Sequence, residues 1–403
     1  MMRIDAHLAI VSDAPFVELA GRPCARPVEC RVIETFAAHF RKVTLVRPRV
    51  IPDLADRAWT PLADWIGVRA LREPGDRLQR LTLQAGLAPR NLPGLLADAD
   101  AVMARLPCYE GVYALRFAVR EGRVSLASLH GDWPEAYRVE WTHGVRGLLG
   151  PYFARRAERI YRRVGREVDL LFPVGESLRQ RYAPQRTDAV VFGNFFLNRE
   201  DLLERGGACS GPTLRLLFVG ALAARKGVRH LLDACALLRE RGRDVQLTLV
   251  GAGDQRDALA EQARKLDLAE RVTFTGFLEL GPELWRHYET HDVFVLPALG
   301  GEGCPNVVIE AMAKSCPVVS TRLGSLPWMI DDRHSGMLVD PGRPDQIAAA
   351  VEALADDVHL CEEVVRGGMR YAAANTHSAN LQQIGDALRR ALVPRFGECA
   401  GPE

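Results

Sequence analysis

The stretch Leu299–Thr321 reads LGGEGCPNVVIEAMAKSCPVVST and decides the fold. The apolar run VFVLP (Val293–Pro297) precedes it, and the run Pro317–Ser320 closes it. Both runs are typical of buried parallel strands, so the residues between them predict a strand-to-helix crossover. This crossover carries two carboxylates, Glu302 and Glu310, in the turn and in the helix that follows it.

Three glycines and a helix start shape the turn. At Gly300, Gly301 and Gly303 the backbone can approach a ligand closely, and we expect Asn306 to cap the helix. The N–H groups of a helix start attract an anion such as phosphate, whereas carboxylates accept hydrogen bonds from the hydroxyl groups of a sugar or a ribose. Taken alone, the pattern also fits an amphipathic helix with a solvated glutamate at each end.

The element EGCPNVVIE, from Glu302 to Glu310, resembles the signature of retaining glycosyltransferases of family 4. That family uses a nucleotide-sugar donor and has the glycosyltransferase B fold, an α/β architecture with two Rossmann-like doubly wound domains facing a cleft. The resemblance covers residues 213–340 with specific motifs, and residues 1–200 only by general layout and by HGDWPE (130–135). The layout HGDWPEAY followed by a long basic helix is similar to bacterial enzymes of exopolysaccharide or lipopolysaccharide assembly.

The composition limits the class of protein. A chain of 403 residues is too long for one core and fits two domains, and its 48% hydrophobic and 26% charged residues are ordinary for a soluble protein. No apolar run reaches about 18 residues and the start lacks a secretory pattern, so we expect a cytoplasmic location. The nine cysteines are scattered without a C-x-x-C, which predicts neither a zinc site nor a disulfide framework.

Alternating strand and helix signals predict two parallel, doubly wound sheets. We expect strands at 7–12, 43–48, 101–105, 124–128, 170–174, 190–194, 214–220, 246–251, 272–276 and 293–297, and helices at 28–39, 76–88, 228–241, 255–266 and 283–290. The expected domains are an acceptor-binding domain (1–200), a linker (201–212), a nucleotide-sugar-binding domain (213–376) and a C-terminal helix (377–403). In the resembled fold this last helix crosses back to the first domain, and ligands are expected at the carboxyl ends of the strands.

Three motifs of the second domain match donor-binding elements of the family. FVGALAARKG (218–227) carries Arg225 and Lys226, which can neutralise a diphosphate, although Ala221 stands where the family commonly has an arginine after Gly220. VGAGDQ (250–255) resembles the glycine turn beside the donor, and TGFLEL (275–280) resembles the segment whose backbone receives the nucleobase. These matches predict donor contacts at Gly251, Phe277 and Leu278. The alternatives are two solvated cations and a tight turn without a ligand.

In the first domain, HGDWPE places His130 at the carboxyl end of a strand. The resemblance implies that His130 contacts the donor sugar; a structural histidine is the alternative, and His143 is a weaker candidate. GSLPWMI (324–330) departs from the family's G-G-x-P-E, because Ser325 and Trp328 replace the second glycine and the acid. No D-x-D ends a strand and Asp331-Asp332 indicates a turn, so we expect neither a metal nor a cofactor.

The residues together predict a retaining hexosyltransferase that uses a nucleoside-diphosphate sugar and acts on a glycan or lipid-linked acceptor, not on nucleic acid. The resemblance implies that Arg225 and Lys226 stabilise the diphosphate, Glu310 binds the ribose, Glu302 and the Gly303 backbone orient the sugar, and Asn306 lies in the same donor site. We expect retention on one face, with the leaving phosphate taking the acceptor's proton. A sugar-nucleotide epimerase, a phosphorylase and a NAD(P)-dependent oxidoreductase are the alternatives.

Charge is unevenly distributed along the chain. Residues 1–205 contain 31 Lys and Arg against 25 Asp and Glu, and residues 206–403 contain 21 against 26. In the segment 151–168, four arginines (155, 159, 162 and 166) recur at helical spacing opposite an apolar stripe. This basic face is either merely solvated or docks on an anionic membrane surface.

Overall fold

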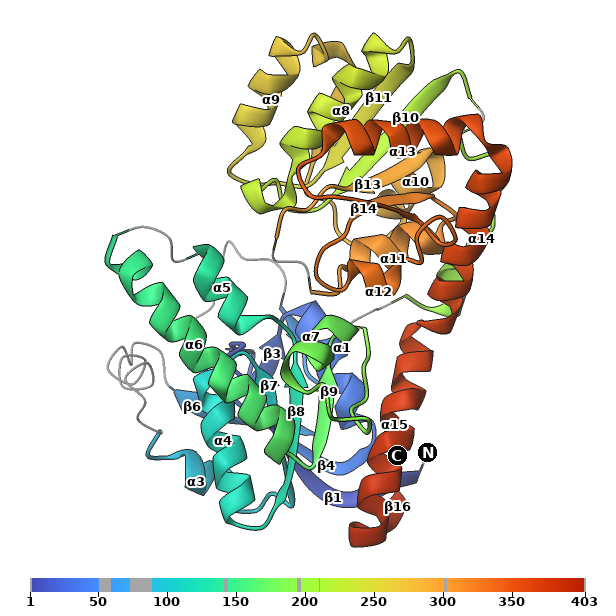
Figure 1. Cartoon of the computed structure of the whole chain (residues 1–403). Coiled ribbons are helices and arrows are strands. Elements are labelled where there is room, and N and C mark those ends of the chain that lie inside the picture. The colour runs from blue at the N-terminus through green and yellow to red at the C-terminus, as the bar shows by residue number, and fades with distance from the viewer. Residues whose placement is uncertain are drawn as a thin grey trace. The chain divides into compact units, whose positions relative to one another are not determined.

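The computed structural model describes residues 2–50, 59–72, 89–140, 144–193, 197–209, 211–300 and 303–401. The chain divides into two compact units, which are drawn in Figure 1: Met1–Asn194 with Asn380–Glu403, and Phe195–Ala379. The second unit includes the described part of the segment 201–212, for which the sequence predicted a linker.

The first unit contains a sheet with the strand order β6-β4-β1-β7-β8-β9, in which all neighbours on this path are parallel. Its strands are β1 (Met2–Val11), β4 (Phe40–Pro48), β6 (Ile66–Arg72), β7 (Ala101–Leu106), β8 (Val124–Leu129) and β9 (Leu170–Pro173). A C-terminal strand, β16 (Glu398–Ala400), pairs antiparallel with β1. A small antiparallel sheet is formed by β2 (Val17–Leu19), β3 (Arg22–Ala25) and β5 (Thr60–Pro61).

The helices of the first unit pack their apolar sides on this sheet. They are α1 (Pro27–Ala37), α3 (Leu92–Leu95), α4 (Tyr109–Arg120), α5 (Trp133–Glu140), α6 (Gly144–Glu167), α7 (Glu176–Tyr182) and α15 (His377–Phe396), which enters the unit at Asn380. Val112 and Leu115 of α4 and Ala157, Tyr161 and Val164 of α6 join one buried cluster. Burial of these side chains supplies the hydrophobic free energy that holds the two helices to β7, β8 and β9.

The second unit contains six parallel strands in the order β12-β11-β10-β13-β14-β15. They are β10 (Thr213–Val219), β11 (Asp244–Val250), β12 (Val272–Gly276), β13 (Val293–Leu296), β14 (Val318–Thr321) and β15 (Met337–Val339). The helices are α8 (Val228–Glu240), α9 (Arg256–Lys265), α10 (Pro282–Thr290), α11 (Asn306–Ala313), α12 (Leu326–Met329), α13 (Pro344–Asp356) and α14 (Val358–Ala374). The order reverses between β10 and β13, which is the switch point where doubly wound sheets bind ligands.

The predicted α/β class with two Rossmann-like domains is confirmed, with local corrections. The strand expected at 190–194 is wrong, because Phe192 forms only an isolated bridge with Val174 beside β9. Strand β6 was missed because Gly67 and Arg69 interrupt its apolar pattern, and β15 because it has only three residues. The helix expected at 76–88 lies outside the described residues.

Candidate active site

The loops at the carboxyl edge of the second unit's sheet are joined through their backbones. Leu222, after β10, donates its N–H to the carbonyl oxygen of Ala252, after β11, at 2.9 Å. Leu299, after β13, donates to the carbonyl oxygen of Arg225 at 2.8 Å. The loops on both sides of the switch point are therefore held by main-chain hydrogen bonds.

Two glycines make this close approach possible. A Cβ atom on Gly251 would lie 1.9 Å from the carbonyl oxygen of Gly220, and one on Gly227 would lie 2.0 Å from the carbonyl oxygen of Pro297. Gly227 has a φ of +68° and Gly251 a φ of +142°, and residues with a side chain rarely adopt these backbone angles. The glycines that the sequence motifs carry at positions 227 and 251 therefore have a steric cause, whatever ligand the loops meet.

Arg225 and Lys226 occupy the 3-10 turn Ala224–Lys226 directly before α8. Arg225 is exposed and Lys226 is half-buried. Since the Arg225 carbonyl is bonded to Leu299, the basic turn has a fixed position relative to the loop after β13. The pair thus lies at the switch point, where a diphosphate could reach it.

Glu310 lies in the second turn of α11 and is half-buried. Its Oε2 accepts a hydrogen bond of 2.9 Å from the hydroxyl group of Tyr288, a fully buried residue of α10. Burial raises the pKa of Glu310 to about 7, and the hydrogen bond from Tyr288 opposes that rise. Near neutral pH the free protein therefore contains both the protonated and the ionised forms of this side chain.

The start of α11 differs from the sequence prediction. Asn306 does not cap the helix, because Pro305 occupies the capping position, with φ −73° and ψ 117°, and Asn306 is the first helical residue. At that position its side chain cannot bond the N–H groups of the first turn as a cap does. Asn306 and Gly303 are half-buried beside this helix start. Glu302 lies outside the described residues.

The segment after β12 presents an aromatic side chain to solvent. Phe277 is 72% exposed, whereas Leu278 packs against the core of the unit. Both residues follow directly on the carboxyl end of β12 at Gly276. They lie in the segment for which the family resemblance implied the nucleobase contact.

In the first unit, His130 follows directly on β8. Its Nε2 lies 2.8 Å from the Oγ of Ser128, and its ring meets the edge of Phe192 with centroids 6.1 Å apart. Burial and the neighbouring Arg105 hold the pKa of His130 well below its usual value, so the imidazole is neutral near pH 7. A neutral imidazole can give one hydrogen bond and accept another. His143 lies outside the described residues.

The described residues contain no group of three or more His, Cys, Asp or Glu side chains that could hold a metal ion. Asp331 lies in a turn, since its carbonyl oxygen accepts the N–H groups of His334 at 3.0 Å and Ser335 at 2.8 Å. Within the same described ranges, none of the helices has the length and apolar character needed to span a bilayer.

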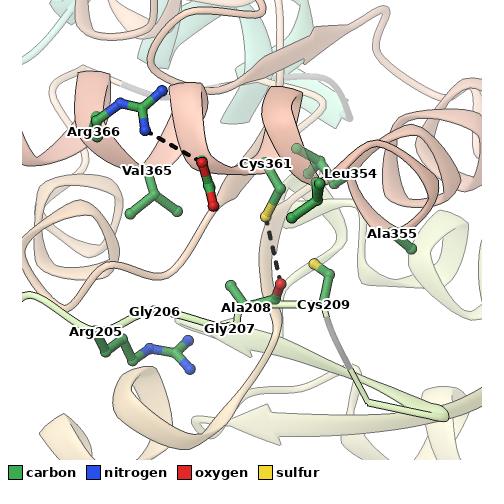
Figure 2. Close-up of a pocket in the computed structure, with 12 residues that line it drawn as sticks. Arg205, Gly206, Gly207, Ala208, Cys209, Leu354, Ala355, Cys361, Val365 and Arg366 are labelled. Atoms are coloured by element: carbon green, nitrogen blue, oxygen red, sulfur yellow. Dashed lines mark hydrogen bonds and ion pairs between the residues drawn. The ribbon is translucent and has the colours of Figure 1, made fainter.

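A cavity of about 440 Å³ in the second unit contains none of the predicted site residues. Figure 2 shows its walls, which come from the segment before β10 and from α13 and α14. The thiol of Cys361 donates to the carbonyl oxygen of Ala208 at 3.7 Å, beside Cys209. Arg205 of this cavity also donates to the carbonyl oxygen of Tyr288 at 3.4 Å. No local signal could have predicted the cavity, because its walls are far apart in the sequence.

Comparison with solved structures defines the class. Sucrose-phosphate synthase from Thermosynechococcus elongatus has a TM-score of 0.67 at 17% identity and covers 96% of this chain and 100% of its own. HepE from Anabaena, solved in complex with UDP, has a TM-score of 0.65 at 16% identity, with coverage of 96% and 100%. These similarities identify the glycosyltransferase B fold.

Sequence comparison finds a family similarity in the second unit. Residues 213–357 match the family model described as glycosyl transferases group 1. An α-D-kanosaminyltransferase of Streptomyces kanamyceticus is 34% identical over 192 residues, which are 47% of this chain and 47% of that protein. A GDP-mannose-dependent α-(1-6)-phosphatidylinositol monomannoside mannosyltransferase of Mycolicibacterium smegmatis is 30% identical over 257 residues, 58% of this chain and 66% of that protein. The chain thus spans between about half and two thirds of these relatives, and its residues 213–357 are similar to the group 1 glycosyltransferases.

Proposed function

We propose that the protein is a retaining, metal-independent hexosyltransferase that uses a nucleoside-diphosphate sugar as donor. One observation carries the proposal. The basic turn of Arg225 and Lys226 is hydrogen-bonded to the loop that leads into α11, the helix of Glu310. The cations suit the diphosphate, whose negative charge grows as the glycosidic bond breaks, and the carboxylate suits the ribose hydroxyls. HepE, which has the same fold, was solved in complex with UDP, and this supports a nucleotide-containing donor.

In this mechanism the other predicted residues act on the transferred sugar. Glu302 and the backbone of Gly303 orient it, and neutral His130 hydrogen-bonds to it near the reacting carbon. The leaving phosphate accepts the proton of the attacking hydroxyl group on the same face of the sugar, so the anomeric configuration is retained. Gly220, Gly251, Phe277, Leu278 and Asn306 complete the donor site.

A panel of UDP-, GDP- and ADP-sugars, with NAD(P) as the competing ligand, tests the donor class by thermal shift. We expect one nucleotide sugar to stabilise the protein and NAD(P) to leave it unchanged; stabilisation by NAD(P) alone would support the oxidoreductase alternative. Proton NMR of the first product then distinguishes retention from inversion. Activity lost in EDTA and restored by magnesium or manganese would contradict the metal-independent mechanism.

We further propose a lipid-linked glycan as acceptor, which fits enzymes of cell-surface polysaccharide assembly. Helix α6 supports this: Arg155, Arg159, Arg162 and Arg166 are all exposed, while Ala157 and Val164 on its other side are buried. Leu148 (82% exposed) and Tyr152 (57% exposed) add apolar surface near the start of the helix. Two cavities of about 250 and 260 Å³ also lie between α4 and α6, with Ile160 and Arg163 in both linings. The M. smegmatis relative is named for a lipid acceptor.

Co-sedimentation with anionic and neutral liposomes tests the membrane contact. Each arginine near an anionic surface contributes about 1 kcal/mol, so the protein should bind anionic vesicles at low salt and leave them at high salt. Changing all four arginines to glutamine should abolish binding. The charge-matched control changes four exposed arginines of the second unit to glutamine: Arg256 and Arg264 on α9 and Arg366 and Arg370 on α14. Equal binding to both vesicle types would show that the basic face is merely solvated.

A further inference from the structure

A row of polar side chains crosses four adjacent strands at the carboxyl edge of the first unit's sheet. The strands are β4, β1, β7 and β8, all parallel to one another. Val11, the last residue of β1, pairs with Val46 and with Ala104, so continuing both registers by one residue brings Ser12 beside Arg47 and Arg105. Arg105 itself pairs with Ser128. Residues in one row of a sheet project from the same face, so these four side chains form one group.

The two arginines of this row share one carboxylate. Arg47 is fully buried, and the side chain of Arg105 is 17% exposed. Oε2 of Glu29, on α1, accepts from Arg47 Nη2 at 3.1 Å and from Arg105 Nη1. Burial acts to raise the pKa of Glu29, but the two guanidinium groups hold that pKa below its usual value, so the carboxylate is ionised. Two cations and one anion leave the trio with one excess positive charge.

Hydrogen-bond donors and acceptors without partners concentrate in this same row. Across the described residues, seven buried side-chain nitrogen and oxygen atoms lack a hydrogen-bond partner, and four of them are Ser12 Oγ, Arg47 Nε, Arg47 Nη1 and Arg105 Nε. A buried polar group without a partner is costly, and a buried charge without compensation costs more. A water molecule could satisfy a hydrogen bond but would leave the excess charge, so the group fits an anion better than water.

The row also lies next to the proposed chemistry of this unit. His130 follows Ser128 on β8, and Arg105 is close enough to lower the pKa of His130. Part of Arg105 and part of His130 reach solvent, whereas Arg47 lies behind them. A ligand that meets His130 at the carboxyl edge therefore also meets the exposed part of Arg105.

We propose that Arg105, backed by Arg47 and Ser12, binds an anionic group of the acceptor, a phosphate or a carboxylate. The assignment of this anion to the acceptor rests on the proposed function. The anion site itself rests on the charge and hydrogen bonding of the row. An anionic acceptor supplies the missing charge and the missing hydrogen-bond partners together. A neutral acceptor leaves the excess charge in place, so the site selects against it.

Inorganic phosphate and acetate, compared with chloride at constant ionic strength, test the site in the full chain. We expect one of the two anions to raise the melting temperature, and the two arms distinguish phosphate from carboxylate recognition. Arg105→Gln should weaken the binding of that anion at least tenfold. Arg162→Gln, which removes an exposed arginine of α6, should leave the affinity for the anion unchanged. The same titration in an Arg225→Ala/Lys226→Ala protein should keep the effect, because that change removes the basic pair of the second unit.

A second variant tests the excess charge directly. Arg47→Met should leave the melting temperature in chloride unchanged or higher, because Glu29 keeps its ion pair with Arg105 and the excess positive charge of the trio is removed. The same change should abolish the response to the anion. A large loss of stability in chloride, or a response to neither anion in the parent protein, would show that the row is internally balanced or filled by ordered water only. Donor binding is measured separately with the nucleotide-sugar panel, so its success alongside a failed anion titration would refute this inference alone.

Discussion

Binding of the donor should depend on pH through Glu310. Because burial raises the pKa of Glu310 to about 7, roughly a tenth of the free protein is ionised at about pH 6 and roughly nine tenths at about pH 8. If the ribose hydroxyls donate to the carboxylate, only the ionised form binds well, and the apparent Kd should fall about tenfold over this range. Stability of the free protein should change in the opposite direction to donor binding. Its free energy of unfolding should decrease as pH rises from the ordinary pKa of 4.5 toward 7, because ionisation of Glu310 is easier in the unfolded chain.

Isothermal titration calorimetry with the nucleotide sugar that the thermal-shift panel selects can measure this change. Glu310→Gln should weaken binding at high pH and remove the pH dependence, because the amide has no charge to lose. A 2′,3′-dideoxy form of the same donor is the matched ligand control, and its affinity should also be nearly independent of pH. A tenfold dependence that survives in Glu310→Gln would refute the assignment of the ribose contact to this carboxylate.

Three further predictions concern the same unit. Tyr288→Phe should move the midpoint of the pH dependence upward, because it removes the hydrogen bond that lowers the pKa of Glu310; an unchanged midpoint in the same calorimetry would contradict this. Arg225→Ala with Lys226→Ala should lower kcat by a larger factor than it weakens donor binding, which steady-state kinetics and titration can compare. Gly251→Ala should reduce the free energy of unfolding by more than about 2 kcal/mol, since its Cβ would lie 1.9 Å from a carbonyl oxygen; a urea transition within error of the parent would disprove the steric argument.

The sequence predicted well what depends on local pattern. Buried parallel strands are nearly continuous apolar runs, so Val293–Leu296 and Val318–Thr321 could be recognised, and with them the crossover that carries Glu310. Glycine turns at strand ends have a local steric cause, which made Gly220 and Gly251 visible. The family comparison supports the same part of the chain, residues 213–357.

What depends on register or on distant neighbours could not be predicted. Arg47 and Arg105 read as ordinary polar ends of two strands, and only the pairing of β4, β1 and β7 brings them together. The partner of Glu310, Tyr288, lies on a different helix, and the sequence contains no signal for that contact. Asn306 was misassigned because the residue that begins a helix depends on backbone angles, which Pro305 sets here.

The backbone contacts among the loops of the second unit have a consequence for how this protein could diversify. The loops after β10, β11 and β13 are held by main-chain hydrogen bonds and by glycines whose neighbours leave no room for a side chain. Ala221, which is exposed, carries none of these contacts through its side chain. Substitutions at such positions can change the surface offered to a donor without dismantling the loops. Under the proposed function, donor preference can therefore change over generations while the architecture that supports it stays constant.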